Sequence, residues 1–422
     1  MATKIVVSIA PQSREEFQEQ YPQAKALGDI VEIRTDRGFI PDQSLAGESV
    51  LITGPCPEIL QPMMLDVPYE RLADVQKLKQ QFPKTKILGS YHGPFENVNE
   101  IIQKLDASPV DFIKIACPCK NALEALELVS ILNAPPTKKP LTIVPMGEQV
   151  SFGRVVAACL GSHLTFTCLD NRPVAPGQIS AEEMIKRYRV QSITQLYGLI
   201  GSPVTRSPSY ITHNHVFQSL NVPAAYVKID LKPEEVEKAM PLLQLCRFRG
   251  LSVTMPLKGK FGPNPVNTIR INPSDIETFN TDGRSVKELL EEKVDLSRST
   301  VLIIGAGGTA QAIAQALSKA GASLIISNRT EEKAEALAKL FGAQTCPFGT
   351  LPEVQVVIQA TCSEDIRLPE ISSMHVVLDV LFPDESPFLK ECKKKGAKTI
   401  SGLDMWKRQA AHQFDIWLGA KQ

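Results

Sequence analysis

The feature that most constrains the fold is a series of eight short, mostly apolar segments in the first half of the chain. Near-continuous apolar segments of this length are typical of parallel strands that are covered on both faces. Helical periodicity appears between some of them, as in Asn121–Asn133 and Arg71–Gln81. We therefore predict an α/β protein whose residues 1–190 form a (β/α)8 TIM barrel. The segments are Ile5–Ile9, Ile30–Arg34, Val50–Thr53, Met63–Val67, Ile87–Tyr91, Phe112–Ala116, Leu141–Pro145 and Leu164–Cys168.

Two places in this pattern mark its irregularity and its end. Gly54–Pro62 contains three prolines and leaves no room for a normal helix after the third strand. Ser180–Arg189 reads as the last barrel helix, with Ser180 as its N-cap and Glu183 at the capping-box position. Val190–Gln195 then forms a short polar connector.

The α/β pattern restarts twice after this connector. Strands are expected at Leu196–Ile200, Ala225–Asp230 and Gly250–Thr254. A second restart has strands at Thr300–Ile304 and Ser323–Ser327 on either side of a helix. We expect a two-lobed unit with lobes at residues 196–295 and 296–422.

Composition and charge restrict the possible partners. Lysine plus arginine number 46 and aspartate plus glutamate also number 46, which argues against a nucleic-acid-binding protein. No apolar run approaches the ~18 residues of a membrane span. The nine cysteines are scattered, and the pair at Cys117–Cys119 lacks the second pair that a metal site would need. Because Met1–Ala10 runs directly into a strand without a signal layout, we expect a cytoplasmic protein that binds small molecules and no metal.

The predicted barrel carries polar residues where its chemistry should lie, at the carboxyl ends of strands. Lys114 lies within the apolar segment Phe112–Ala116, and burial there should lower its pKa and favour a neutral, nucleophilic amine. The alternative is a lysine that snorkels from the strand end to solvent. His92 ends the preceding strand and could move protons near neutral pH, or be a satisfied core histidine.

Further charged and polar groups lie on the same predicted rim. Glu32 and Arg34 alternate with apolar neighbours, and they could simply pair with each other across the barrel mouth. Arg154 and Gln178 lie on the loops that follow later strands. Together with the amine and the imidazole, these groups suit a keto acid that bears hydroxyls.

Four motifs in the first half resemble the signatures of type I 3-dehydroquinate dehydratases. Order and spacing match through about Ile179, and the motifs are Val31–Arg34, Ser90–His92, Ile113–Ala116 and Ala175–Gln178.

The resemblance implies a role for each of these residues. Lys114 would form an imine with the substrate ketone, and His92 would remove the C2 proton and protonate the leaving hydroxyl. Arg154 and Gln178 would hold the carboxylate, with Glu32 and Arg34 on the ring hydroxyls. The chain departs from the family at Thr53–Glu58, which lacks the usual arginine after the third strand, and at Val174, where a serine is common.

The second half carries an ordered set of turn motifs, each of which alone would be read as an ordinary turn or cap. As a set they resemble shikimate dehydrogenases. The motifs are Tyr197–Ser209, Ser252–Lys258, Asn267–Thr268, Asn280–Gly283 and Gly402–Ala410.

This second resemblance implies that Lys258 and Asp282 form the catalytic pair beside the substrate ketone. Ser207 and Ser209 would bind the substrate carboxylate. Ring hydroxyls would be bound by Thr254, Asn267, Asp282 and Gln409. Lys258 and Asn267 are only nine positions apart, much closer than is usual in the family, so a helical segment is missing between them.

A glycine-rich turn from Gly305 to Ala310 follows one strand and opens a helix, as in dinucleotide-binding folds. The next strand ends in Asn328-Arg329-Thr330, which offers a cation and a hydroxyl where an NAD site usually has an acidic residue. The prediction is therefore NADP(H), with Gln359–Thr361 near the nicotinamide ribose and Met405 against the nicotinamide. The predicted cofactor-binding residues are Gly305, Ala306, Gly307, Gly308, Thr309, Ala310, Asn328, Arg329, Thr330 and Met405.

The preferred reading is an enzyme that dehydrates 3-dehydroquinate in the barrel and reduces the product to shikimate in the second half. Three alternatives remain open. The second half could be an NAD-dependent quinate/shikimate dehydrogenase, which Arg329 opposes. The chain could be a metabolite sensor that has lost activity, which the two shortened segments suggest and the paired catalytic residues oppose. The barrel alone could be an unrelated lyase that uses a lysine imine.

Overall fold

The computed structural model describes residues 2–205, 207–363, 366–368, 370–382 and 385–419. Its contacts divide the chain into two compact units, Met1–Leu251 and Ser252–Gln422.

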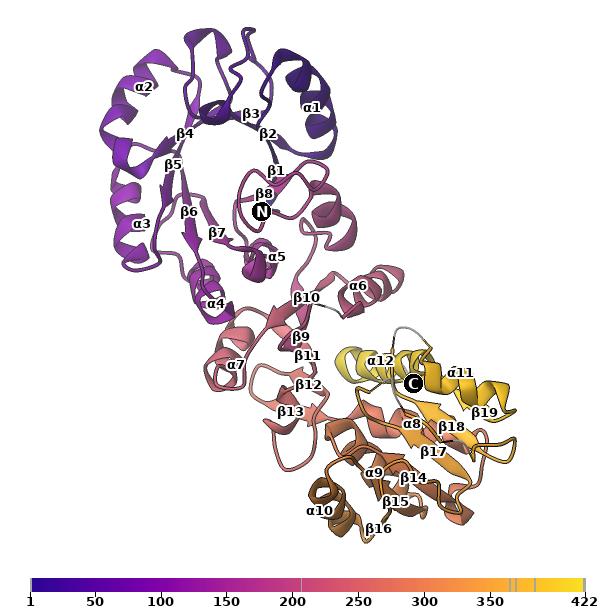
Figure 1. Ribbon diagram of the computed structural model, residues 1–422. Helices are drawn as coiled ribbons and strands as arrows, with labels where there is room; N and C mark the ends of the chain where they lie inside the picture. The colour runs from indigo at the N-terminus through magenta and orange to yellow at the C-terminus, as the bar shows by residue number, and fades with distance from the viewer. Residues whose placement is uncertain (1, 206, 364–365, 369, 383–384, 420–422) are drawn as a thin grey trace. The chain divides into compact units, whose positions relative to one another are not determined.

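The first unit begins with the predicted barrel. Its eight strands are ordered β7-β6-β5-β4-β3-β2-β1-β8, with parallel neighbours, and they form a ring with helices on the outside (Figure 1). Between β7 and β8 the ring is bridged by the His163 N–H, which donates to the Leu141 carbonyl at 2.8 Å. The strands are β1 (Lys4–Ile9), β2 (Ile30–Arg34), β3 (Val50–Thr53), β4 (Met64–Pro68), β5 (Lys86–His92), β6 (Phe112–Pro118), β7 (Leu141–Met146) and β8 (Leu164–Cys168). The barrel prediction is confirmed.

The outer helices differ in detail from the pattern expected. The segment expected as one helix at Arg71–Gln81 is a 3₁₀ turn, η3 (Tyr69–Asp74), followed by a helix. The proline-rich stretch holds only the short turn η2 (Glu58–Leu60), as its prolines predict. The Ser180 hydroxyl does accept from the Glu183 N–H, but the helix that follows is the π-helical turn η6 (Glu183–Arg187). The α-helices are α1 (Arg14–Leu27), α2 (Val75–Gln81), α3 (Val98–Ala107), α4 (Ala122–Ser130) and α5 (Phe152–Cys159).

The first unit continues past the connector into part of the second half. Strands β9 (Gln195–Gly201) and β10 (Ala224–Asp230) pair in parallel. Barrel helices α4 and α5 pack against α7 and β10, and the Arg247 side chain donates to the Cys159 carbonyl at 3.1 Å. The same part holds α6 (Ser209–Ser219), α7 (Val236–Leu245) and β11 (Phe248–Val253), the strand in which the first unit ends.

The second unit is built on a parallel sheet ordered β16-β15-β14-β17-β18-β19. Strand order reverses next to β14, which has β15 on one side and β17 on the other, and such switch points are where open α/β sheets bind ligands. A short antiparallel pair precedes the sheet. The strands are β12 (Thr268–Ile271), β13 (Ile276–Phe279), β14 (Thr300–Ile304), β15 (Ser323–Ser327), β16 (Gln344–Thr345), β17 (Val356–Gln359), β18 (Val376–Asp379) and β19 (Lys398–Ile400).

Helices cover both faces of this sheet. One core cluster joins one face to side chains of α8, α9 and α10, and another joins the opposite face to α11. The helices are α8 (Thr281–Glu291), α9 (Gly308–Lys319), α10 (Glu331–Phe341), α11 (Pro387–Lys394) and α12 (Gly402–Leu418). Within the described residues, no helix has both the length and the apolar character needed to cross a bilayer.

Candidate active sites

Lys114 lies inside the barrel. Lys114 is 5% exposed, and its Nζ donates to Asp66 Oδ2 at 2.7 Å. The ammonium also lies 4.5 Å from the centroid of the Phe166 ring. The lysine therefore does not snorkel to solvent, which removes the main alternative to a role in the barrel interior.

The carboxylate beside Lys114 is itself held in place. The Ser90 hydroxyl donates a hydrogen bond to Asp66 Oδ1, the oxygen that Lys114 does not use. Ser90 is the register partner of Lys114 on the neighbouring strand, and both it and Asp66 are buried. Amine, carboxylate and hydroxyl thus form a fixed triad on β4, β5 and β6.

His92 ends β5, two residues beyond Ser90 and opposite Ala116. His92 is exposed at the end of the strand. Partial desolvation of its ring, reinforced by the charge of Lys114, lowers the pKa of His92 to about 4. The imidazole is therefore neutral near pH 7 and able to accept a proton.

Glu32 and Arg34 both lie on β2, but they do not pair with each other. Glu32 is 3% exposed and accepts a hydrogen bond from the Thr53 hydroxyl at 2.8 Å. Arg34 instead forms a two-pronged ion pair with Asp36, at 2.8 and 2.7 Å, which raises the pKa of the guanidinium. Glu32 is thus held facing the interior, while Arg34 is partly committed to a neighbouring loop.

Arg154, on α5, is a buried cation, and one of its three guanidinium nitrogens has no hydrogen-bond partner among the described residues. Its two terminal nitrogens donate to the carbonyls of Phe166 and Pro176, each at 3.1 Å. Its Nε is buried and finds no partner within the described structure. Burial lowers the pKa of Arg154 to about 10, yet the group stays charged at neutral pH. A buried guanidinium held by neutral carbonyls is suited to an anionic group.

Gln178 closes the loop beside Arg154. Its side-chain oxygen accepts from the N–H groups of Val174 and Ala175, and its amide nitrogen donates to the Ser8 hydroxyl at 3.2 Å. The neighbouring Gly177 has φ +71°, and a Cβ there would lie 2.3 Å from the Gly147 carbonyl oxygen. Gln178 thus shapes the rim of the barrel through this loop.

Asp66 is the functional candidate that the sequence reasoning missed. It lies within the apolar segment Met63–Val67, just as Lys114 lies within Phe112–Ala116. A charged residue inside an apolar strand was the signal used for the lysine, and applied to the aspartate it would have found the pair.

In the second unit Lys258, in the turn η7 (Leu257–Gly259), lies against Asp282, the second residue of α8. The Lys258 Nζ donates to Asp282 Oδ2 at 2.5 Å and to Thr309 Oγ1 at 3.0 Å. The side chains of Lys258 and Asp282 are 15% and 8% exposed. The predicted catalytic pair is thus in direct contact.

Asn267 orients this pair from behind. Its amide nitrogen donates to Asp282 Oδ1 at 2.8 Å and to the Thr281 hydroxyl at 2.9 Å. Its side-chain oxygen accepts from the Thr281 N–H and the Thr268 hydroxyl. Both N–H donors of the Asn267 amide are engaged, and its oxygen accepts two hydrogen bonds. The side chain is therefore fixed against the pair, and its contact with a ring hydroxyl stays a prediction.

The other residues predicted around the substrate are placed as follows. Gln409, on α12, is half-buried and accepts from the Thr281 hydroxyl at 3.3 Å. Thr254 is half-buried just past β11. In the first unit, Ser207 donates to the hydroxyl of Ser209, which begins α6, at 2.9 Å.

The glycine turn of the second unit fits a dinucleotide. Gly305 has φ +125°, and a Cβ there would lie 2.8 Å from the Ala360 carbonyl oxygen, so no side chain is tolerated. The N-cap residue of α9 is Gly307, which supplies no side-chain cap, and its ideal Cβ meets no atom within 4 Å. Gly308 and Thr309 begin the helix, while Ala310 is fully buried beneath it. The space beside Gly307 at the N-terminus of α9 is thus open, which suits a pyrophosphate.

Residues after β15 fit the end of such a cofactor that carries an additional phosphate. Arg329 and Thr330 are exposed, and the Asn328 amide donates to the Thr330 carbonyl at 2.9 Å. Gln359 is fully buried, and it bonds to the Thr361 N–H and the Ser363 carbonyl. Ala306, in the turn itself, is half-buried.

Met405, the residue predicted to touch the nicotinamide, lies in the first turn of α12. It is 6% exposed and belongs to the core cluster that α8, α9 and α10 form over the sheet. Its packing supports the start of α12.

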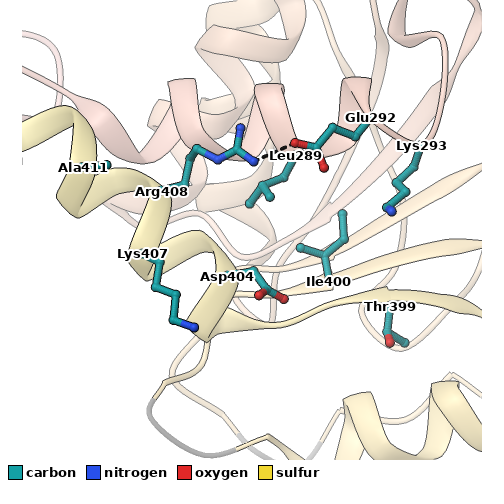
Figure 2. A pocket seen from close by; sticks show the side chains of 9 residues that line it. All are labelled: Leu289, Glu292, Lys293, Thr399, Ile400, Asp404, Lys407, Arg408 and Ala411. Carbon is teal, nitrogen blue, oxygen red and sulfur yellow. Dashed lines mark hydrogen bonds and ion pairs between the residues drawn. The ribbon is translucent and has the colours of Figure 1, made fainter.

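A cavity of about 500 Å³ lies between the end of α8, β19 and α12, and contains none of the predicted site residues (Figure 2). Arg408 lies on its wall and pairs with Glu292 at 2.6 Å. Its lining mixes Leu289 and Ile400 with charged groups that point in several directions. The chemistry of the second unit is therefore outside this cavity.

Comparison with known proteins agrees with the two resemblances. The model for type I 3-dehydroquinase matches residues 60–195. The shikimate dehydrogenase substrate-binding domain matches residues 199–281, and shikimate/quinate 5-dehydrogenase matches 288–379. Fold and matched families together define a dehydroquinase barrel joined to a shikimate dehydrogenase unit.

Relatives with the same arrangement span most of the chain. The shikimate biosynthesis protein AroDE of Chlamydia pneumoniae is 32% identical over 84% of this chain and 78% of its own. The chloroplastic bifunctional 3-dehydroquinate dehydratase/shikimate dehydrogenase of Arabidopsis thaliana is 28% identical over 80% of this chain and 64% of its own. The crystal structure of shikimate dehydrogenase from Aquifex aeolicus covers 54% of this chain and 94% of its own, with 31% identity and a TM-score of 0.50. The chain belongs to the AroDE family of shikimate biosynthesis proteins.

Proposed function

We propose that this protein converts 3-dehydroquinate to 3-dehydroshikimate in its barrel and reduces that product to shikimate with NADPH in its second half. The matched domains and the names of the relatives support both activities. The observation that carries the first activity is the buried Lys114 beside Asp66. The second rests on Lys258 and Asp282 in contact at the start of α8.

In the barrel, Lys114 would attack the ring ketone and lose water to give an imine. Its nitrogen must be free of the extra proton to attack, and Asp66 is the base within reach. The imine draws electrons from the ring, so the C2 proton becomes acidic. His92, neutral because its pKa is lowered, would take that proton and pass one to the departing hydroxyl. Water then releases the product from Lys114.

Substrate contacts in the barrel follow from charge and reach. Arg154, a buried cation whose Nε is left over, would bind the carboxylate beside the loop that Gln178 shapes. Glu32 would accept from a ring hydroxyl, while Arg34 would contact another beside its own partner Asp36.

In the second half, Lys258 would deliver a proton to the ketone oxygen as it becomes an alkoxide. Asp282 would hold the ammonium and accept from a ring hydroxyl, with Thr254 and Gln409 on the remaining hydroxyls. Ser207 and Ser209 would bind the carboxylate. When bound, NADPH supplies the hydride that reaches the carbonyl carbon.

The cofactor is assigned as NADP(H) because several relatives carry it in their names. Shikimate dehydrogenase (NADP(+)) of Aquifex aeolicus is 32% identical over 55% of this chain. Arg329 and Thr330 would meet the 2′-phosphate, and the Gly305–Ala310 turn the pyrophosphate. We place the functional divisions at residues 1–190, 196–295 and 296–422, and the protein in the cytoplasm, where its nine unpaired cysteines would stay reduced.

The experiment is to give the purified protein 3-dehydroquinate with and without NADPH. Formation of the enone product is followed by its ultraviolet absorbance, and reduction by loss of NADPH. The proposal expects enone to accumulate without NADPH and shikimate to form with it. Enone without any NADPH loss, including when 3-dehydroshikimate is supplied directly, would reject the second activity; binding of both compounds without turnover would favour the sensor.

A further inference from the structure

The short connection between Lys258 and Asn267 lies against helix α9. The Val266 N–H donates to the Lys258 carbonyl at 2.7 Å, which closes the connection into a tight loop. The Gln315 amide of α9 donates to Asn264 of this loop at 3.3 Å. A Cβ placed on Gly308 would lie 3.5 Å from the Lys258 Cβ. The loop therefore lies along the beginning of α9, and Lys258 lies beside the glycine turn.

The beginnings of α8 and α9 come together at this point. A Cβ on Gly283 would lie 2.2 Å from the Ala312 carbonyl oxygen, so only glycine permits this approach of the two helices. Asp282 precedes Gly283 on α8, and Thr309 is the second residue of α9. Both side chains thereby reach the same ammonium, at 2.5 and 3.0 Å.

Two fixed acceptors determine where the third proton of an ammonium points. A lysine ammonium carries three N–H groups in tetrahedral arrangement and can rotate about its terminal bond. With Asp282 as its single partner, two N–H groups would remain, and the flexible lysine side chain could swing about that one contact. With Thr309 as a second partner, one N–H is left, and its direction is set.

We propose that Thr309 is a positioning residue for the reduction, in that its hydroxyl orients the Lys258 ammonium so that the remaining proton faces the substrate oxygen. The inference rests on the proposed function. It gives the Thr309 side chain a role in proton delivery, distinct from the contact of the α9 amides with the cofactor. The glycine turn thus carries part of the proton-transfer machinery.

The test compares Thr309→Val, which keeps the shape and loses the hydroxyl, with Thr309→Ser, which keeps the hydroxyl. For each, the full chain is assayed for reduction of 3-dehydroshikimate at saturating NADPH, which yields kcat and its solvent deuterium isotope effect. The Kd for NADPH is measured separately by fluorescence. For Thr309→Val we expect kcat to fall about tenfold, the cost of one hydrogen bond to a charged group. The solvent isotope effect should rise, NADPH Kd should stay within about twofold, and Thr309→Ser should restore most of kcat.

Controls separate a positioning role from damage to the fold. Thr345→Val makes the same chemical change at an exposed position of β16 and should leave all values unchanged. Retained NADPH binding shows that the second unit of the variant is folded; if Thr309→Val fails this check, Thr309→Ala is measured against Thr309→Ser in the same way.

Two outcomes would overturn the proposal. One is an unchanged kcat in Thr309→Val, whether or not the Kd for NADPH rises. The other is a loss of kcat that Thr309→Ser does not repair. A wild-type protein without reductase activity would instead reject the proposed function itself.

Discussion

The two halves of the protein each set a lysine against an aspartate, and a hydroxyl completes the group differently in each. In the barrel, Ser90 bonds to the carboxylate of the Lys114–Asp66 pair. In the second unit, Thr309 bonds to the ammonium of the Lys258–Asp282 pair. The Ser90 hydroxyl donates to the carboxylate, so it competes with Lys114 for the negative charge of Asp66. The Thr309 hydroxyl accepts from the ammonium, so it helps to fix the orientation of the N–H groups of Lys258.

The two lysine–aspartate pairs also differ in burial. The side chains of Lys114 and Asp66 are 6% and 1% exposed, against 15% and 8% for Lys258 and Asp282. A lysine that must become a neutral nucleophile is thus placed deeper than a lysine that must keep a proton to donate. The pairing of lysine with aspartate alone therefore does not define the chemistry, because the third group and the burial separate the two roles.

The largest expected effect tests the nucleophile. Lys114→Ala should abolish dehydration because it removes the one lysine that is buried among the described residues. Reduction of added 3-dehydroshikimate should continue. Borohydride with 3-dehydroquinate should add mass to wild type at Lys114, which peptide mass spectrometry locates. Labelling at another lysine would show that Lys114 is not the nucleophile of the barrel.

The proton donor of the second unit comes next. Lys258→Met should lower the kcat for reduction by about 10² to 10⁴, the usual contribution of a general acid. Dehydration in the barrel of the same molecule is the matched control and should keep its rate. Equal losses in both reactions would point to a fault in folding.

Removing the charge of Asp66 should lower both the dehydration rate and the stability of the protein. Asp66→Asn leaves Lys114 buried without its counter-charge, and breaking such pairs costs about 3–5 kcal/mol of stability. We expect dehydration to fall roughly hundredfold and the thermal unfolding midpoint to drop. Ser90→Ala keeps the ion pair and should cost less in both measurements; a larger loss in Ser90→Ala would reverse the proposed order of importance.

A smaller effect is expected at the cofactor. Arg329→Ala should raise KM for NADPH about tenfold by removing one charge-assisted contact with the 2′-phosphate. KM for NADH, which lacks that phosphate, should change little. Comparable changes for the two nucleotides would reject the contact.

The smallest expected effect is a shift in titration. Because the native pKa of His92 is lowered to about 4, its base form is present above that pH, and the acid limb due to His92 should lie near pH 4 rather than near 6.5. In Lys114→Met, loss of the lysine charge should raise this pKa, while burial keeps it below 6.5. Imidazole resonances followed by NMR during titration measure both values. An unchanged His92 pKa in Lys114→Met would show that the charge of Lys114 does not act on His92.

Sequence patterns predicted the strands well because each buried strand must be apolar along its length. They predicted less where tertiary contacts decide. Three of the four side-chain hydrogen bonds of Asn267 join it to Thr281 and Asp282, so they form only where the start of β12 meets the start of α8. Arg34 turns to Asp36 although Glu32 is equally near in sequence. The bond from Lys258 to Thr309 depends on the approach of two helices that are far apart in the chain.

The packing of α4 and α5 against α7 and β10 has a consequence for anyone who would divide the protein. A fragment started at the polar connector would uncover Cys246, the residue after α7, which is fully buried and in contact with the Leu126 carbonyl. It would also leave the Arg247 guanidinium without its barrel acceptor. Because α7 and β10 are covered by barrel helices, a reductase expressed without the barrel would expose this surface and should be prone to aggregate.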